Sequence, residues 1–114
     1  MPFMFEDLDV YRKATIFDVE INRLCRNIRH LAIKDQLQRA SLSIPLNIAE
    51  GNGRNTAREK IQFYKMARGS LFECVPLLEI SYKLGYLNEQ YDQLYRSAEE
   101  IGKMINGLIN SIKH

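Results

Sequence analysis

The chain has 114 residues, which is enough for one domain and too few for two domains that would each bury a core. Its hydrophobic fraction of 46% and charged fraction of 26% exclude wholesale disorder, and no apolar run approaches the roughly 20 residues that span a bilayer. The net charge of +2, from 16 basic and 14 acidic residues, identifies no class of partner by itself. We therefore expect a single domain over residues 1–114, without a signal peptide or membrane segment, in the cytoplasm.

Apolar residues recur at spacings of three and four in four segments, which is the pattern of an amphipathic helix. The first segment starts at a cap on Asp7 or Asp9 and continues to about Leu31. The second runs over about 33–51. Pro45 lies inside this second segment and predicts a kink or a short break, because proline lacks the backbone donor that a helix needs.

The third segment begins after the capping pair Asn55-Thr56 and ends at Leu84, with Gly85 as its stop signal. Pro76 predicts a second kink inside it, and the fourth segment starts after Asn88. Because the links between segments are short, successive helices are expected to be antiparallel neighbours. The sequence predicts an all-α protein, an antiparallel up-down-up-down four-helix bundle.

Residue types that could serve catalysis or metal binding are not spaced for that chemistry. Cys25 and His30 project about 140° apart on a helix, a poor geometry for a nucleophile and its base. No Glu precedes a His by three residues, which is the spacing of a two-metal site in a bundle. Gly51-Asn52-Gly53 has no strand before it and is interpreted as a helix stop and a turn. We expect no enzyme activity, no catalytic residue, no cofactor and no metal.

One face of the second segment carries polar side chains that are mostly uncharged. At about 100° per residue they form a narrow stripe, made of Gln36, Arg39, Ser43, Asn47 and Glu50. A plain solvated face would hold more Lys and Glu, so the composition favours a hydrogen-bonded polar seam at an interface. Leu42 and Leu46 lie on a third side of this helix and are predicted to form an oligomer contact.

Basic residues outnumber acidic ones over positions 54–68, where Glu59 is the only acid. The basic residues are Arg54, Arg58, Lys60, Lys65 and Arg68. Arg58 and Lys65 are seven residues apart and therefore share a helix face. Such an arrangement can neutralise the phosphates of nucleic acid, but an ordinary solvated helix face accounts for the same composition. Both interpretations stay open on charge alone.

Three stretches of the sequence resemble one known family. They are Gln36-Leu-Gln-Arg39-Ala40-Ser-Leu-Ser43-Ile-Pro45-Leu-Asn47-Ile-Ala49-Glu50-Gly51-Asn-Gly-Arg54, the opening Phe5-Glu-Asp-Leu8-Asp-Val10-Tyr11, and Ala67-Arg-Gly69-Ser70-Leu71-Phe-Glu73 with the turn Leu84-Gly85-Tyr86. Together they are similar to the four-helix bundle proteins encoded in intervening sequences of bacterial 23S rRNA genes, although Pro76 departs from the family pattern.

The resemblance implies a ring-like homo-oligomer, a pentamer, and structural or interfacial roles for the central motif. It also implies similarity to the accessory protein of diversity-generating retroelements, which partners a reverse transcriptase and binds nucleic acid. The first function expected is therefore a non-enzymatic oligomeric bundle that binds RNA or DNA, structured RNA above all, through the basic surface over 54–68. The alternative is a protein-interaction scaffold or accessory subunit that meets a protein partner and binds no nucleic acid.

Overall fold

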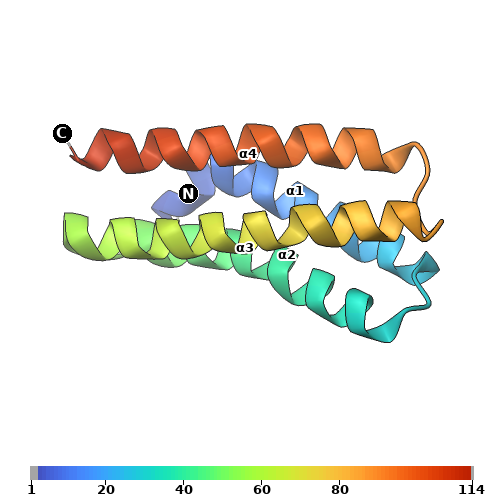
Figure 1. The fold of residues 1–114 in the computed structure, drawn as a ribbon. Helices are drawn as coiled ribbons and strands as arrows, with labels where there is room; N and C mark the ends of the chain where they lie inside the picture. The colour runs from blue at the N-terminus through green and yellow to red at the C-terminus, as the bar shows by residue number, and fades with distance from the viewer. Residues whose placement is uncertain (1–2, 114) are drawn as a thin grey trace.

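The computed structural model describes residues 3–113, so residues 1, 2 and 114 of the expected domain lie outside the described part. Its elements are η1 (Met4–Asp7), α1 (Asp9–Leu24), η2 (Cys25–Asn27), α2 (Leu31–Asn52), α3 (Ala57–Lys83) and α4 (Gln90–Lys113). Successive helices run in opposite directions (Figure 1), and the described residues contain no strand. The predicted all-α up-down-up-down four-helix bundle is confirmed. No helix within residues 3–113 is long and apolar enough to cross a membrane.

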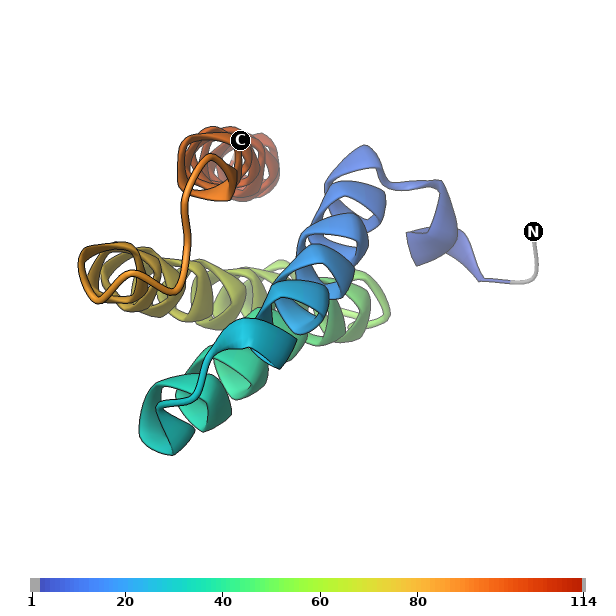
Figure 2. The same ribbon diagram turned by 90° about the vertical axis from the view of Figure 1, so that its right-hand side faces the viewer.

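The bundle is elongated, with extents of 43 × 26 × 22 Å. α2 and α3 form the most extensive helix pair, α1 packs on α2, and α4 packs on α3 and on α1. Figure 2 looks nearly along α4 and shows α1 inclined to it. One end of the bundle is formed by the turn between α2 and α3, and the other end by the α1–α2 and α3–α4 turns (Figure 1). The α1–α2 turn and the α2–α3 turn therefore lie at opposite ends.

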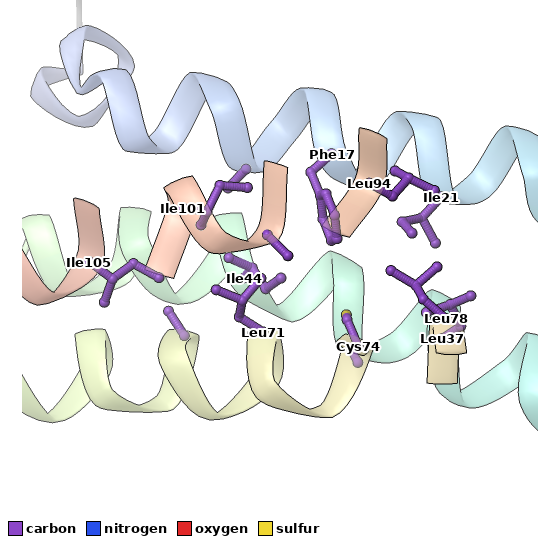
Figure 3. Packing of buried hydrophobic residues seen from close by; sticks show 14 of the residues in the cluster. Phe17, Ile21, Leu37, Ile44, Leu71, Cys74, Leu78, Leu94, Ile101 and Ile105 are labelled. Carbon is purple, nitrogen blue, oxygen red and sulfur yellow. The ribbon is translucent and has the colours of Figure 1, made fainter. Parts of the chain in front are cut away.

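The core is one cluster to which all four helices contribute, because each apolar stripe faces the bundle axis. Figure 3 shows these side chains pointing toward one another between the helices. Phe17 comes from α1, Ile44 from α2, Leu71 from α3 and Ile101 from α4, and each is at most 2% exposed. The spacings of three and four that predicted the helices are the same spacings that bury these residues.

The first helix is shorter than the periodicity predicts. α1 ends at Leu24, and the chain passes through η2 and an extended Ile28 before α2 begins at Leu31. His30 is the N-cap of α2, where its Nδ1 accepts the Ile33 backbone N–H at 3.3 Å. The prediction that the first segment reaches Leu31 is wrong. Ile28 is buried within the link, so the turn continues the apolar spacing of a helix without being helical.

Capping follows the prediction at α3 and departs from it at α1. Thr56 is the N-cap of α3: its Oγ1 accepts the Glu59 N–H at 3.1 Å, and its hydroxyl donates to the Glu59 carboxylate at 3.0 Å. The N-cap of α1 is Leu8, which has no side-chain cap. Asp9 lies instead in the first turn of α1, where a carboxylate still interacts favourably with the positive end of the helix dipole.

Within residues 3–113 no helix ends at a proline, whereas α2 has Gly53 as its C-cap and α3 ends just before Gly85. α2 continues through Pro45 and α3 through Pro76, so the short break considered at Pro45 is wrong. Pro45 is buried, and packing on both sides of it offsets the roughly 3 kcal/mol that proline costs a helix interior. Gly85, with φ of 88°, ends α3 as predicted, and the Tyr86 N–H donates to the Ser81 carbonyl at 2.9 Å.

Candidate nucleic-acid interface

The five basic residues predicted to bind nucleic acid lie on and near the turn between α2 and α3. Arg54 lies in the turn, Arg58 and Lys60 lie in the first turn of α3, and Lys65 and Arg68 follow farther along that helix. The capping box at the start of α3 fixes where this helix begins. The structure therefore places all five at one end of the bundle and along the adjoining part of α3 (Figure 1).

Arg54 is held by contacts within the chain. Its Nη2 lies 2.7 Å from Oε2 of Glu50, and its Nη1 lies 4.0 Å from Oε2 of Glu59. The guanidinium also stands over the Phe63 ring at 4.6 Å from its centroid. Two carboxylates largely compensate the charge, so Arg54 braces the α2–α3 turn and offers little free charge to a ligand.

Two further basic residues are also engaged. The Lys60 ammonium donates to the Asn52 carbonyl at 2.7 Å, which ties α3 to the end of α2. Arg68 Nη1 donates to Oδ1 of Asn106 at 2.7 Å, which links α3 to α4. Neither partner carries a charge, so both cations keep their full charge while their positions are fixed by the fold.

Arg58 and Lys65 are the two basic residues of this surface that are free. Both are exposed, and neither makes an ion pair or a side-chain hydrogen bond within residues 3–113. Their spacing of seven residues places them on the same side of α3, about two helical turns or 10 Å apart. Of the five predicted residues, Arg58 and Lys65 are therefore the ones whose charged groups are free to meet a ligand. Lys60 and Arg68, whose side chains are held by hydrogen bonds, lie near them in sequence on α3.

The polar seam of α2 is hydrogen-bonded over part of its length. Asn47 Nδ2 donates to both the carbonyl and the hydroxyl oxygen of Ser43 at 2.8 Å. The Ser70 hydroxyl of α3 donates to the Ser43 hydroxyl, also at 2.8 Å. These groups form a polar bridge between α2 and α3, at the pair of helices that packs most extensively.

The ends of the seam behave differently from its middle. Glu50 pairs with Arg54. Arg39 pairs with Asp35 at 3.2 Å and not with Glu50, and both partners are mostly exposed. Gln36 is exposed and makes no side-chain hydrogen bond within the described residues. The seam is thus a local α2–α3 contact over positions 43–54, and a solvated face over positions 36–39.

Leu42 and Leu46, predicted to form an oligomer contact, are 48% and 58% exposed. Leu46 lines a depression of about 780 Å³ together with Phe3, Met4 and Glu50. Phe3 and Met4 are themselves exposed large apolar residues. The start of the chain and the middle of α2 therefore present apolar side chains on the surface of a single copy.

A second apolar depression lies between α3 and α4, and the periodicity did not reveal it. Its volume is about 440 Å³, and Phe72, Val75, Pro76 and Tyr95 line it. Phe72 is 62% exposed, although the next residues on its helix toward the core, Leu71 and Cys74, are buried. Because α3 is apolar on more than one side, sequence spacing alone could not separate its core face from this exposed one.

The basic residues at the other end of the bundle were missed by sequence reasoning. Arg23, Arg26, Arg29 and Lys34 lie in or beside the α1–α2 turn, with no acidic residue between Glu20 and Asp35. The signal in the sequence was this run of four basic residues without an acidic residue. It was hidden because the first 34 residues, counted together, have a net charge of only +1.

The two cysteines are free thiols buried in the core. Burial raises the pKa of Cys74 to about 12, and neighbouring acidic charges reinforce the shift. Burial also raises the pKa of Cys25, opposed in part by the charge of Lys34. Both thiols are therefore neutral at ordinary pH, which disfavours reaction as nucleophiles. No group of three His, Cys, Asp or Glu residues within positions 3–113 could hold a metal ion.

Comparison with known proteins agrees with the resemblance seen in the sequence. No curated protein matches the chain. A crystal structure from Bacteroides thetaiotaomicron, described as a protein with unknown function from the S23 ribosomal protein family, superposes with a TM-score of 0.82 and 24% identity, covering 89% of this chain and 95% of that one. At that identity the likeness supports the fold alone. Residues 6–107 match the family model for 23S rRNA-intervening sequence proteins, and the chain therefore belongs to that family.

Proposed function

We propose that this protein is a non-enzymatic, homo-oligomeric four-helix bundle that binds nucleic acid, structured RNA in particular, through the basic surface over 54–68. The observation that carries the proposal is the pair of free, exposed cations Arg58 and Lys65 on one side of α3. Lys60 and Arg68 support it, because neutral partners hold their charges in place. Phosphate oxygens are the natural partners of such cations, and each phosphate neutralised releases counterions.

Oligomerisation would multiply this modest charge. Two free cations per chain make a weak surface, but a closed ring repeats them in every subunit and so builds a stronger local field. Leu42 and Leu46 are proposed to form the contact between copies, since they expose apolar area four residues apart on one side of α2. The pentamer implied by the family resemblance is part of the same proposal.

RNA binding is tested by fluorescence anisotropy with a labelled RNA hairpin, between about 50 and 200 mM salt. The double variant Arg58→Glu/Lys65→Glu should weaken binding and flatten the dependence of log K on log salt. Arg96→Glu/Lys103→Glu is a matched control, because these two exposed α4 residues are also seven apart and change the net charge equally. Equal loss in both variants would mean that only net charge matters. No RNA binding by the wild type at the lowest salt would overturn the proposal.

The oligomer is tested by light scattering at tens of micromolar protein. Leu42→Asp/Leu46→Asp should dissociate the assembly, whereas Ile16→Asp, which changes an α1 residue 57% exposed, should leave it intact. A monomeric wild type rejects the assembly, and an intact Leu42→Asp/Leu46→Asp oligomer rejects this contact. Both variants should keep the helical circular dichroism of the wild type, because all three positions lie outside the core.

The second candidate function is a protein-interaction scaffold that binds no nucleic acid. The observation that favours it is the apolar depression between α3 and α4, where Phe72 and Tyr95 expose large side chains. Such patches are typical of protein interaction sites. An oligomer that fails to bind RNA at low salt would favour this function over the first.

A further inference from the structure

The α1–α2 turn concentrates positive charge without a compensating acid in sequence. Arg23 lies in the last turn of α1, Arg26 lies in η2, Arg29 lies in the link, and Lys34 lies in the first turn of α2. Four cations within twelve consecutive residues, with no carboxylate among them, give a local net charge of +4. This equals the net charge of residues 54–68, which include five basic residues and one acidic residue, Glu59.

The three arginines of this turn are free, unlike most of the basic residues at the other end. Arg23, Arg26 and Arg29 are all exposed, and none makes an ion pair or a side-chain hydrogen bond within residues 3–113. A free guanidinium offers a planar set of donors that can bind a phosphate through two parallel hydrogen bonds. The α1–α2 turn thus holds three such groups, whereas the α2–α3 turn has one free arginine, Arg58.

Nearby acidic residues cancel only part of this charge, and one of them, Glu89, lies in the α3–α4 turn beside Gln90 and Gln93. Asp35 is paired with Arg39 at 3.2 Å. The Asp18 carboxylate accepts the Ser41 hydroxyl at 2.7 Å, but because that partner is neutral Asp18 keeps its charge. Glu20 lines a depression of about 310 Å³ together with Arg23, so it offsets part of the charge on that side. Arg26 and Arg29 lie beyond this depression and make no contact with a carboxylate. These two are therefore the strongest candidates for an anion.

The turn that carries these arginines is held rigidly by its own buried residues. Leu24, Cys25 and Ile28 are each at most 8% exposed, and they alternate with the exposed Arg26 and Arg29. The His30 imidazole fixes the start of α2 through the bond to the Ile33 N–H described above. Binding an anion would therefore order two side chains without ordering the backbone, which lowers the entropic cost of binding.

The polar surroundings of the turn fit nucleic acid better than an acidic peptide. Asn27, Gln90 and Gln93 line the same depression as Arg23 and offer amide donors and acceptors suited to sugar hydroxyls and base edges. Lys34 and the last residue of α2, Asn52, are also 18 residues apart, or about 27 Å along the helix. A phosphodiester chain is a polyanion that can reach both ends and carries one charge at every nucleotide.

We propose that the α1–α2 turn is a second nucleic-acid-binding surface, in which Arg26 and Arg29, flanked by Arg23 and Lys34, contact backbone phosphates at the end of the bundle opposite Arg58. The proposal rests on the nucleic-acid binding proposed above and adds a second point of contact to it. Together the two surfaces would let one subunit hold two separate segments of a folded RNA.

The test compares Arg26→Gln/Arg29→Gln with Arg58→Gln/Lys65→Gln and the control Arg96→Gln/Lys103→Gln, using the full chain and a labelled RNA hairpin with a stem of about one helical turn. Removing two phosphate contacts should lower affinity about tenfold or more near 100 mM salt, and reduce the salt slope by roughly 1.5. Arg26→Lys/Arg29→Lys should restore the slope, because the charge returns. Unchanged helical circular dichroism would confirm that each variant is folded.

The outcomes separate this proposal from the previous one. If Arg58→Gln/Lys65→Gln weakens binding and Arg26→Gln/Arg29→Gln does not, the second surface is rejected and the first stands. The reverse result supports the α1–α2 turn and rejects the surface over 54–68. Wild-type protein that binds no RNA at about 50 mM salt overturns both. Poly-glutamate that competes as well as unlabelled RNA of equal charge overturns the assignment to phosphate.

Discussion

Gly51 provides a sharp test of the packing between α2 and α3. A Cβ atom built on Gly51 would lie 2.7 Å from Cε1 of Tyr64 and 3.0 Å from Cβ of Phe63. Tyr64 is 1% exposed, so its ring has no room to swing aside, and the Cβ of Phe63 is attached directly to the α3 backbone. Gly51→Ala must therefore push α2 and α3 apart locally.

Two opposing effects decide the sign of the change. Alanine favours a helix over glycine by about 1 kcal/mol in a helix interior, and by less in the last turn, where Gly51 lies. Overpacking a well-packed core costs about 1–3 kcal/mol. The clash wins, and we expect Gly51→Ala to lower the free energy of unfolding by about 1–2 kcal/mol.

Gly69→Ala is the matched control, because Gly69 lies inside α3 and a Cβ there meets nothing within 4 Å. It should raise the free energy of unfolding by about 0.5–1 kcal/mol through helix propensity alone. Urea unfolding followed by circular dichroism measures both midpoints. In thermal unfolding, 1 kcal/mol corresponds to about 4 °C for a chain of this length. A Gly51→Ala midpoint equal to or above that of Gly69→Ala would refute the packing argument.

Four further predictions concern individual residues. Gly85→Ala should cost about 1–2 kcal/mol in urea unfolding, because φ of 88° strains any residue with a Cβ, and an unchanged midpoint would contradict this. Ellman's reagent at pH 8 should label neither Cys25 nor Cys74 until urea unfolds the protein, whereas prompt labelling of the native state would show an accessible thiol. Burial raises the pKa of Cys74 from 9.0 to about 12, so ionisation of this thiol favours the unfolded chain. The contribution of the neutral thiol to the free energy of unfolding is therefore complete below pH 9 and is lost as the pH rises toward 12. Asp18→Ala should lower the free energy of unfolding by about 1–2 kcal/mol, because the buried Ser41 hydroxyl loses its acceptor at 2.7 Å. In a Ser41→Ala background the same substitution should lower it by less. Equal losses in the two backgrounds would argue against the hydrogen bond.

The helical periodicity predicted the four helices because the spacing that buries a helix face is visible in the sequence. The capping pair Asn55-Thr56 likewise predicted the start of α3, and Thr56 is its N-cap, because capping depends only on residues close in sequence. The link before α2 was misplaced because Ile28 keeps the apolar spacing while its backbone is extended. Local patterns thus identify a buried position without revealing its backbone conformation.

The candidate surfaces depended on tertiary structure to a greater degree. The sequence shows Arg54, Lys60 and Arg68 only as cations, and contacts with Glu50, Asn52 and Asn106 decide how much of their charge a ligand can meet. The spacing on α2 did place Ser43 beside Asn47, but not the Ser70 hydroxyl that joins them from α3.

The sequence by itself determined the helical class, the number of helices, their main stops and the family, because these follow from local spacing and from a long motif. Only the tertiary structure decided which side chains are free. That decision depends on partners distant in sequence, such as Arg68 with Asn106, and on close approach between helices, as at Gly51. The sequence determines how many charged side chains the protein has, whereas the contacts in the folded protein decide which of those charges a ligand can meet.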